Sequence, residues 1–333
     1  MKSQQTLFVC EFITGGGFSG AALPESLAQE GLMMRDALLK DLAALDDWRI
    51  VTTHDARVSP PYIYSITVDA ISDVWAIWRE CMAAADAVWV IAPETDHILY
   101  HMAEMARELQ VCWIGPQLEA IAVTSQKYLT AQVLARAGLP VIPAYFYSEW
   151  LPDASRAWVV KPNDGAGCES TYMFNQADAL NAWFVDDPQR QHTHVIQPYV
   201  TGTPASICVL GYSDEAFLLS CNLQSIVVQD GKFSYVGGCM NGAAAYWPQL
   251  NQLAQAIKAA TPGLVGYFGV DVLLDTSDAG ELTIVEINPR LTTSYAYLNQ
   301  AMGCNPAAMI MEAMLAPAFT APAIQREQIA FYV

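Results

Sequence analysis

The chain has 333 residues, and its 34 acidic against 16 basic side chains give a net charge of −18. A field of this sign disfavours nucleic acid and anionic membranes as partners. Hydrophobic residues make up 53% of the sequence, but no uninterrupted apolar run reaches membrane-spanning length, and the first residues lack the design of a signal peptide. We therefore expect a cytoplasmic protein of two or three subdomains.

The first third of the chain alternates apolar strands with helices. Strands are expected at Leu7–Thr14, Arg49–Thr53, Ala87–Ala92 and Val111–Gly115, and helices at Ser26–Leu45, Val74–Ala85 and Ile98–Leu109. Alternating βαβ units predict a doubly wound parallel sheet, so the predicted fold class is α/β. Gly115-Pro116 marks a boundary, which gives an N-terminal α/β domain over residues 1–116.

A glycine cluster follows the first predicted strand. Gly15-Gly16-Gly17-Phe18-Ser19-Gly20 matches part of the dinucleotide-binding fingerprint Gly-x-Gly-x-x-Gly. The acid that this fingerprint needs further on is badly placed, because Asp41 falls inside the predicted helix and Asp55 comes late. Three interpretations stay open for the cluster: a loop that faces a substrate, a structural turn, and an NAD site.

Two lysines lie in settings that are typical of phosphate contacts. Lys127 opens a predicted helix that ends at Ala137-Gly138, and Lys161 lies at the end of the predicted strand Trp158–Pro162. Small residues let backbone N–H groups approach phosphate oxygens. Such residues follow Lys161 at Gly165, Ala166 and Gly167. The order differs from a P-loop, in which the lysine comes after the glycines, and a surface turn is the alternative for this segment alone.

A predicted hairpin carries the most informative residues of the chain. Glu286, Asn288 and Arg290 occupy alternate positions of the strand Leu282–Arg290, so their side chains share one face. The strand Gly269–Asp275 and a turn at Thr276–Gly280 would place Asp271 opposite Glu286. Opposed carboxylates repel each other, and a divalent cation bound between them would replace this repulsion with attraction. Asp271, Glu286 and Asn288 therefore predict a magnesium site, with manganese as a substitute, and the alternative is a solvated polar face.

In their order, these segments resemble the ATP-grasp superfamily over roughly residues 120 to 315. Val195–Gly202 matches the adenine hinge of that family, although Pro198 and Thr201 replace acids that are common there, which leaves the ribose contact open. The resemblance implies ATP clamped by two α+β subdomains, over residues 117–195 with a glycine-rich lid and 196–333 with the metal site. It implies ATP contacts from Lys127, Lys161, Gly165, Ala166, Gly167, Gln197, Pro198, Tyr199 and Val200.

A narrower resemblance rests on Glu11–Gly17, Leu23–Leu27, Glu30–Met34 and Ala92–Asp96. These segments are similar to the ATP-grasp group that contains tyramine–glutamate ligase, which makes amides for methanofuran- and methylofuran-type cofactors. The resemblance implies an ATP-dependent ligase, which joins a carboxylate, expected to be glutamate, to an aromatic amine like tyramine or tyrosine. It also implies a homodimer. Substrate contacts are then expected from Glu11, Gly15, Gly16, Gly17, Glu94, Thr293 and Tyr295.

The reaction that this resemblance implies passes through an acyl phosphate. The carboxylate attacks the γ-phosphorus of ATP, with Arg290 and Lys161 as catalytic residues on the transferred group. The amine then displaces phosphate, and the candidates for its base are Glu11, Glu94 and Glu169. The alternatives are a ligase for another amino-acid or peptide pair, a nucleotide-binding regulator, and an NAD-dependent enzyme that uses Gly15–Gly20.

Overall fold

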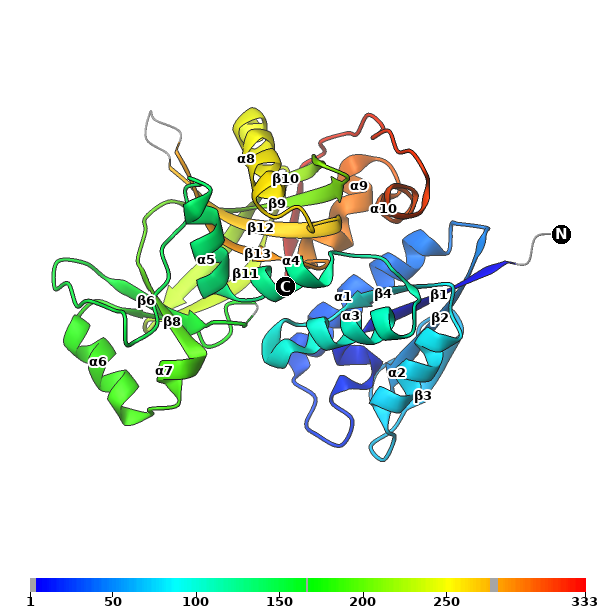
Figure 1. The fold of residues 1–333 in the computed structure, drawn as a ribbon, viewed down its shortest axis with the longest axis horizontal. Helices are drawn as coiled ribbons and strands as arrows, with labels where there is room; N and C mark the ends of the chain where they lie inside the picture. Colours follow the sequence, from blue (N-terminus) through cyan, green and yellow to red (C-terminus); the bar gives the residue numbers. More distant parts are fainter. Residues whose placement is uncertain (1–3, 166, 276–280) are drawn as a thin grey trace.

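In the computed structural model, which describes residues 4–165, 167–275 and 281–333, a five-stranded sheet lies beside a nine-stranded sheet (Figure 1). The first belongs to the N-terminal part of the chain and pairs its strands in parallel. The second pairs its strands antiparallel. None of the helices in these ranges is both long enough and apolar enough to cross a lipid bilayer.

The parallel sheet has the doubly wound order β3-β2-β1-β4-β5, which confirms the predicted fold class. Because side chains alternate along a strand, Leu7 and Val9 pack towards α1 whereas Phe8 and Cys10 pack towards α2 and α3. Its elements are β1 (Gln5–Glu11), α1 (Glu25–Leu42), β2 (Trp48–Asp55), β3 (Ser65–Val68), α2 (Val74–Ala83), β4 (Ala87–Ile91), η2 (Thr95–His97), α3 (Ile98–Glu108) and β5 (Cys112–Trp113).

Several boundaries in this part differ from the predictions. The second strand runs over Trp48–Asp55 rather than Arg49–Thr53, and the last over Cys112–Trp113 rather than Val111–Gly115. The first strand ends at Glu11 rather than Thr14, because the Glu11 carboxylate accepts the backbone N–H groups of Ile13 and Thr14. Those bonds curl the chain into a π-helical turn, η1 (Ile13–Gly17). The helix α1 ends at Leu42 rather than Leu45. The edge strand β3 was missed, since a run this short shows little periodicity.

The antiparallel sheet follows the order β13-β12-β9-β10-β11-β7-β6-β8, and β14 pairs with β11. The helix α8 covers one face, where Leu250 and Ile257 share a buried cluster with Phe268 of β12. Its strands are β6 (Trp158–Pro162), β7 (Tyr172–Phe174), β8 (His194–Pro198), β9 (Thr203–Tyr212), β10 (Glu215–Gln229), β11 (Lys232–Met240), β12 (Gly266–Leu274), β13 (Leu282–Asn288) and β14 (Ile329–Tyr332).

The remaining helices connect and cover these strands. They are α4 (Leu118–Thr124), α5 (Lys127–Arg136), α6 (Ala177–Asp186), α7 (Arg190–Thr193), η3 (Ala244–Tyr246), α8 (Trp247–Ala260), η4 (Thr293–Tyr297), α9 (Leu298–Met302) and α10 (Pro306–Leu315). The helix α5 begins at Lys127 and its cap is Ala137, followed by Gly138 with a positive φ, as the sequence predicts. The helix α6 packs on β6 and β8 through a small core of its own that contains Leu180 and Phe184.

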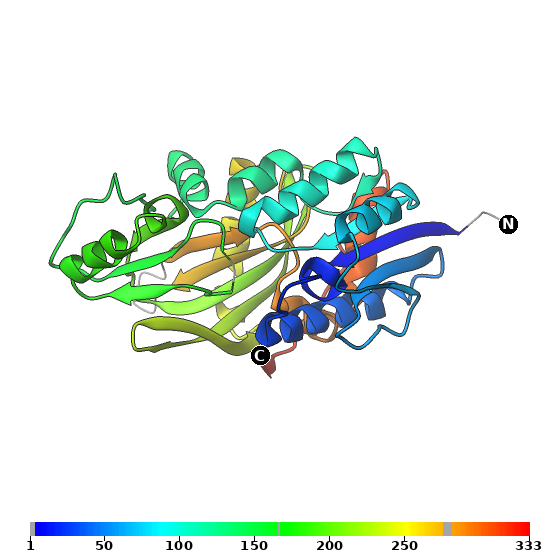
Figure 2. The same ribbon diagram turned by 90° about the horizontal axis from the view of Figure 1, so that it is seen from below.

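The two sheets share a hydrophobic core where they meet. Leu38 of α1 belongs to the same buried cluster as Tyr267 of β12, Tyr295 of η4 and Leu298 of α9. A polar contact lies inside this junction: the Tyr295 hydroxyl donates to Asp41 Oδ2 at 3.0 Å. Seen from below, α1 runs along the end of the antiparallel sheet, next to the C-terminus (Figure 2). The core therefore fixes the N-terminal domain against the hairpin β12–β13.

Candidate active site

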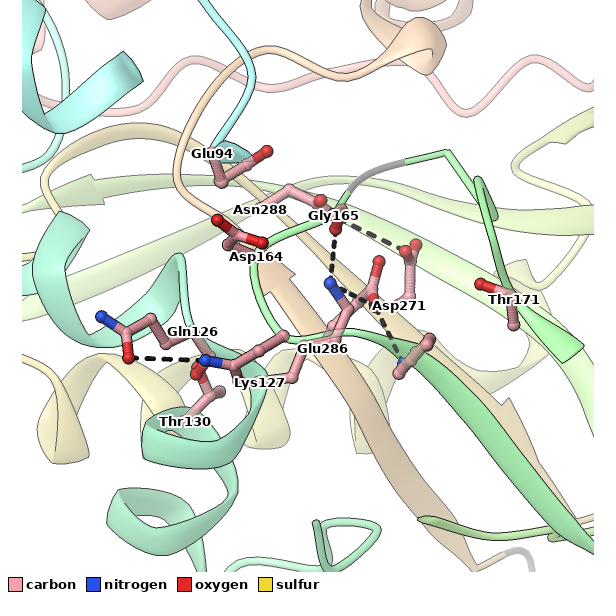
Figure 3. Close-up of polar contacts among 12 residues, drawn as sticks. Glu94, Gln126, Lys127, Thr130, Asp164, Gly165, Thr171, Asp271, Glu286 and Asn288 are labelled. Carbon is pink, nitrogen blue, oxygen red and sulfur yellow. Dashed lines mark hydrogen bonds and ion pairs between the residues drawn. The ribbon is translucent and has the colours of Figure 1, made fainter. Parts of the chain in front are cut away.

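The hairpin β12–β13 has the predicted register. Asp271 pairs with Glu286 across the two strands, and Gly269 pairs with Asn288. The turn predicted at Thr276–Gly280 lies outside the described residues. A shift in register directly after Asp271 breaks the regular alternation, so the hairpin carries its polar side chains at a local irregularity. Figure 3 shows Asp271, Glu286 and Asn288 beside Lys127 and the Gly165 backbone.

The two opposed carboxylates lie in different electrostatic surroundings. Burial and the neighbouring Glu286 raise the pKa of Asp271, which accepts hydrogen bonds from Gln224 Nε2 at 2.9 Å and Asn288 Nδ2 at 3.3 Å. Burial alone would also raise the pKa of Glu286, but Lys161 and Lys127 outweigh it and hold that pKa below its usual range. Glu286 is therefore paired with two lysines, whereas Asp271 forms no ion pair with any residue that the structure describes.

This donor set fits a magnesium ion. Two carboxylates and a side-chain amide supply hard oxygen ligands, and a hard divalent cation takes one or two carboxylates together with phosphate oxygens. The repulsion that raises the pKa of Asp271 is the cost that such a cation would relieve. The residues present are therefore compatible with the metal that the sequence predicts.

Both predicted lysines converge on Glu286. Lys161 Nζ lies 3.0 Å from Glu286 Oε2 and Lys127 Nζ lies 3.7 Å from the same atom. Lys127 is placed by the start of α5, where its backbone N–H donates to the Asn163 carbonyl and the next N–H donates to Asn163 Oδ1. Asn163, which follows Lys161, thus accepts free N–H groups at the start of α5. These bonds hold the segments that carry the two lysines close together.

The glycine-rich segment after Lys161 folds back over these groups. Lys127 Nζ donates to the Gly165 carbonyl, and burial followed by the carboxylates of Glu286 and Asp271 raises the pKa of Cys168 to about 12. Gly167 has a φ of 66°, in the left-handed region that favours glycine. Asp164 Oδ2 accepts the backbone N–H of Asp96 at 3.0 Å, so the segment also contacts the N-terminal domain. The predicted contact at Ala166 lies outside the described residues.

The predicted adenine hinge lies beside the strand of Lys161. In the antiparallel pair β6–β8, Pro198 is opposite Trp158 and Gln197 is opposite Val159. The Gln197 side chain is buried and donates to the Ile142 carbonyl at 3.4 Å, whereas Tyr199 is 41% exposed. Val200 follows directly. Gln197 is therefore turned into the protein, whereas Tyr199 and Thr201 of this segment are exposed.

Arg290 reaches across to the N-terminal domain. Its Nε lies 3.0 Å from Glu94 Oε1, and its Nη1 donates to the Leu291 carbonyl at 3.0 Å. Glu94 follows β4, next to β1 at the point where the strand order of the parallel sheet reverses, which is where ligands bind in such sheets. The structure thus places the predicted substrate residue Glu94 against the predicted catalytic arginine.

Four other predicted substrate positions are enclosed by protein. Glu11 is 2% exposed, and it accepts hydrogen bonds from Ile13 and Thr14. Gly16 has a φ of 111°, and a Cβ there would lie 2.6 Å from Val68 Cγ1; at Gly17 it would lie 2.4 Å from the Phe12 ring. Gly15 is also buried, against Thr53. This geometry favours the structural turn among the interpretations left open, because close packing accounts for the glycines.

Tyr295 and Thr293 differ, although they are neighbours. Tyr295 is 1% exposed and bonded to Asp41, so it has no surface to offer a substrate. Thr293 is half-buried, and its hydroxyl donates to Glu30 Oε2 at 3.1 Å. Glu30 belongs to the segment Glu30–Met34, but the sequence predicted no role for it. Roles for Gln224 and Tyr235 were not predicted either. The alternating positions of Gln224 and Asn222 on β10 were the available signal.

Comparison with known proteins agrees with this geometry. A family model described as ATP-grasp domain matches residues 124–294, and one described as pre ATP-grasp 3 domain matches residues 48–121. The chain belongs to the ATP-grasp family.

Within that family, two curated relatives share a name. The tyramine–L-glutamate ligase of Methanocaldococcus fervens is 27% identical over 290 residues, which cover 85% of this chain and 86% of the relative. The enzyme of the same name from Methanocaldococcus jannaschii is 26% identical and covers 87% and 83%. A solved ATP-grasp superfamily protein from Archaeoglobus fulgidus superposes with a TM-score of 0.70 at 20% identity, over 98% of this chain and 99% of that one.

Proposed function

We propose that this protein is an ATP-dependent ligase that joins the carboxylate of glutamate to an aromatic amine such as tyramine through an acyl phosphate. The observation that carries the proposal is the meeting of Lys127 and Lys161 with the Asp271–Glu286 pair, with Arg290 on the same hairpin. Such a set is what phosphoryl transfer needs: cations for the phosphates and hard ligands for a metal. The names of the curated relatives supply the substrate pair.

ATP and magnesium would bind between the lysines and the hairpin. Asp271, Glu286 and Asn288 would hold magnesium, or manganese in its place, and the bound ion would offset the charge of the phosphates. Lys127 and Lys161 would exchange their contacts with Gly165 and Glu286 for phosphate oxygens. The exposed Tyr199 and the backbone of Val200 lie in the hinge where adenine would be held.

Arg290 is held ready for an anion by two contacts. Glu94 takes its Nε and the Leu291 carbonyl takes its Nη1, whereas Nη2 has no hydrogen-bond partner in the described part of the chain. A fixed guanidinium can meet the transferred phosphoryl group without reorganising, which favours the charge that develops there. Glu94 is therefore a positioning residue, and the substrate carboxylate would lie on the free side of Arg290.

The two steps balance in atoms and electrons. A carboxylate oxygen of glutamate forms a bond to the γ-phosphorus, and the bond from that phosphorus to the bridging oxygen breaks with its electrons leaving on ADP. The neutral amine nitrogen then forms a bond to the acyl carbon, and the C–O bond to phosphate breaks with its electrons leaving on phosphate. The proton that the nitrogen loses goes to the released phosphate. The lid, whose Gly165 carbonyl accepts a hydrogen bond from Lys127, would exclude water from the acyl phosphate.

Release of ADP in the presence of magnesium and glutamate, with the amine varied, tests this function. The panel contains tyramine, tyrosine, a furan-methylamine conjugate, glutamate itself and other amino acids, and products are identified by mass spectrometry. We expect ADP release that depends on one aromatic amine, together with an amide of matching mass. If no amine stimulates ADP release although magnesium–ATP raises the melting temperature, the glutamate–amine pair is wrong.

The other two classes of function make different predictions. A nucleotide-binding regulator needs no complete catalytic set, whereas here both lysines, the two acids, Asn288 and Arg290 are all present. An NAD-dependent enzyme would gain thermal protection from NAD rather than from magnesium–ATP. The packing of Gly16 and Gly17 against Val68 and Phe12 weighs against a dinucleotide at that turn.

A further inference from the structure

The acids around the site that could receive an amine differ in their partners and in their burial. Glu11 is bonded to Ile13 and Thr14, Glu94 is paired with Arg290, and Asp164 accepts the N–H of Asp96. Glu169 is exposed on the lid. Glu30 is a half-buried residue on α1. Its Oε2 accepts the Thr293 hydroxyl, and in the described ranges its Oε1 has no hydrogen-bond partner.

Glu30 lies on the N-terminal side of the reacting groups. Thr293, which donates to Glu30 Oε2 at 3.1 Å, comes shortly after Arg290 in the chain. This hydrogen bond therefore holds Glu30, from α1, beside the segment that follows Arg290. An amine held at Glu30 would therefore be close to the acyl phosphate, and it can attack the acyl carbon once its ammonium group has given one proton to water.

Tyr235 on β11 packs on a buried cluster that α1 also contributes to. That cluster contains Met34, which lies one helical turn beyond Glu30. Burial raises the pKa of the Tyr235 phenol, and the carboxylates of Asp271 and Glu30 raise it further. Tyr235 is half-buried, and its ring packs against the core that the two sheets share. Its hydroxyl has no hydrogen-bond partner among the residues described. The side chain thus offers an apolar ring face and a hydroxyl next to the core that α1 and β12 share.

We propose that Glu30 binds the ammonium group of the amine substrate and that the Tyr235 ring packs against the apolar part of that substrate. This inference rests on the proposed ligase function and assigns its second substrate to named residues. Thr293 binds one oxygen of the Glu30 carboxylate, and the other oxygen can accept a hydrogen bond from an N–H donor. A hydrogen bond between an ammonium group and a carboxylate is charge-assisted and therefore stronger than one between neutral groups. The net charge of −18 favours the approach of a cation.

The test separates the two half-reactions. Hydroxylamine, a small neutral nucleophile, traps the acyl phosphate as a hydroxamate and needs no ammonium site. In Glu30→Gln we expect the KM for tyramine to rise about 10- to 100-fold, as for the loss of a charge-assisted hydrogen bond. Hydroxamate formation from ATP and glutamate should stay within about threefold of the wild-type rate. Glu25→Gln, the same change at an exposed position of the same helix, should leave the KM for tyramine unaltered.

The other possible outcomes of this experiment contradict either the assignment of Glu30 or the ligase function. An unchanged KM for tyramine in Glu30→Gln overturns the assignment of Glu30. An equal loss of hydroxamate and amide also overturns it, because Glu30 would then act only by positioning Arg290. A wild-type enzyme that forms neither product refutes the ligase function itself. Melting temperatures of all variants show whether a loss comes from misfolding.

Tyr235 provides an independent variant. Tyr235→Leu keeps an apolar side chain but removes the aromatic face, so we expect a higher KM for tyramine and a smaller preference for tyramine over ethylamine. Tyr235→Phe keeps the ring and should retain most of that preference. If Tyr235→Leu discriminates between the two amines as well as the wild type does, the ring does not contact the substrate.

Discussion

Glu286 is the counter-charge of both lysines. Two buried ammonium groups lie within 3.7 Å of one of its oxygen atoms, and Asp271 of the same hairpin faces it across the strands. Removing one partner from a buried set of charges leaves the others uncompensated. The carboxylate is therefore needed to hold the lysines close together before any phosphate binds.

Glu286→Gln should abolish most of the activity while the protein still folds. We expect ADP release to fall at least about 100-fold, because one metal ligand and the counter-charge of both lysines are lost together. Steady-state rates and the melting temperature measure the two effects separately. Glu281→Gln changes an exposed acid just before β13 and should leave the rate unaltered. Activity of Glu286→Gln near that of the wild type would refute the metal assignment.

The helix α1 serves both the site and the stability of the fold. Glu30 in its first half faces Thr293, whereas Asp41 near its end accepts the Tyr295 hydroxyl and the Asn299 amide. The backbone carbonyl of Asp41 also accepts Asn305 Nδ2 at 2.7 Å, at the start of α10. The contacts that anchor α1 to the C-terminal elements therefore also fix the position of Glu30, the proposed substrate residue.

The ionisation of Asp41 should make stability depend on pH. Burial raises its pKa more than the bonds from Asn299 and Tyr295 lower it, so the folded state binds more protons than the unfolded state. Its contribution to stability is therefore complete below the unfolded pKa of about 3.9 and is lost as pH rises through the folded value. In Asp41→Asn that decline should be absent. Urea unfolding of both proteins between pH 4 and 7 measures the difference, and parallel curves would contradict the prediction.

The turn η1 should be sensitive to methyl groups for steric reasons. Gly16→Ala places a Cβ 2.6 Å from Val68, whereas at Gly138, with a similar left-handed φ, nothing lies within 4 Å. We expect a loss of about 1 kcal/mol for Gly138→Ala from backbone strain. For Gly16→Ala, overpacking adds to that strain, giving about 2–4 kcal/mol. Chemical denaturation measures both. Equal losses would show that the turn has room for a side chain.

At the scale of the whole molecule, the shared core couples the two sheets. Leu38 from the N-terminal domain and Leu298 from the C-terminal part belong to one buried cluster, whereas Leu180 belongs to the separate small core under α6. Elements that bury the same apolar surface lose stability together. The protein should therefore unfold its parallel sheet and the strands β9 and β12 as one unit.

Hydrogen exchange checks this coupling. Leu298→Ala should lower the opening free energies of β1 and β12 amides by equal amounts, about 2–4 kcal/mol. Leu180→Ala makes the same truncation at another fully buried leucine and should act mainly on β6 and β8. A loss confined to β12 in Leu298→Ala would mean that the sheets open independently.

Local patterns predicted the strands and the reactive side chains better than they predicted how distant segments meet. The register of Asp271 and Glu286 followed from strand alternation and turn length, and the start of α5 at Lys127 from its helix signal. The end of β1 could not be foreseen, because a side chain of the strand itself bends the chain after Glu11. Glu30 and Thr293 lie 263 positions apart, and only the shared core brings them together.

The contact between Lys127 and the Gly165 carbonyl has a consequence for affinity. If phosphate binds Lys127 as proposed, the main chain of the lid acts as an internal competitor for the same ammonium group. A measured dissociation constant for ATP then contains the free energy of displacing this competitor, so it understates the strength of the phosphate contacts. The same competition favours the release of ADP, because the Gly165 carbonyl can replace it on Lys127. The hydrogen bond between Asp164 and Asp96 keeps the lid next to the N-terminal domain, so this carbonyl stays close to Lys127.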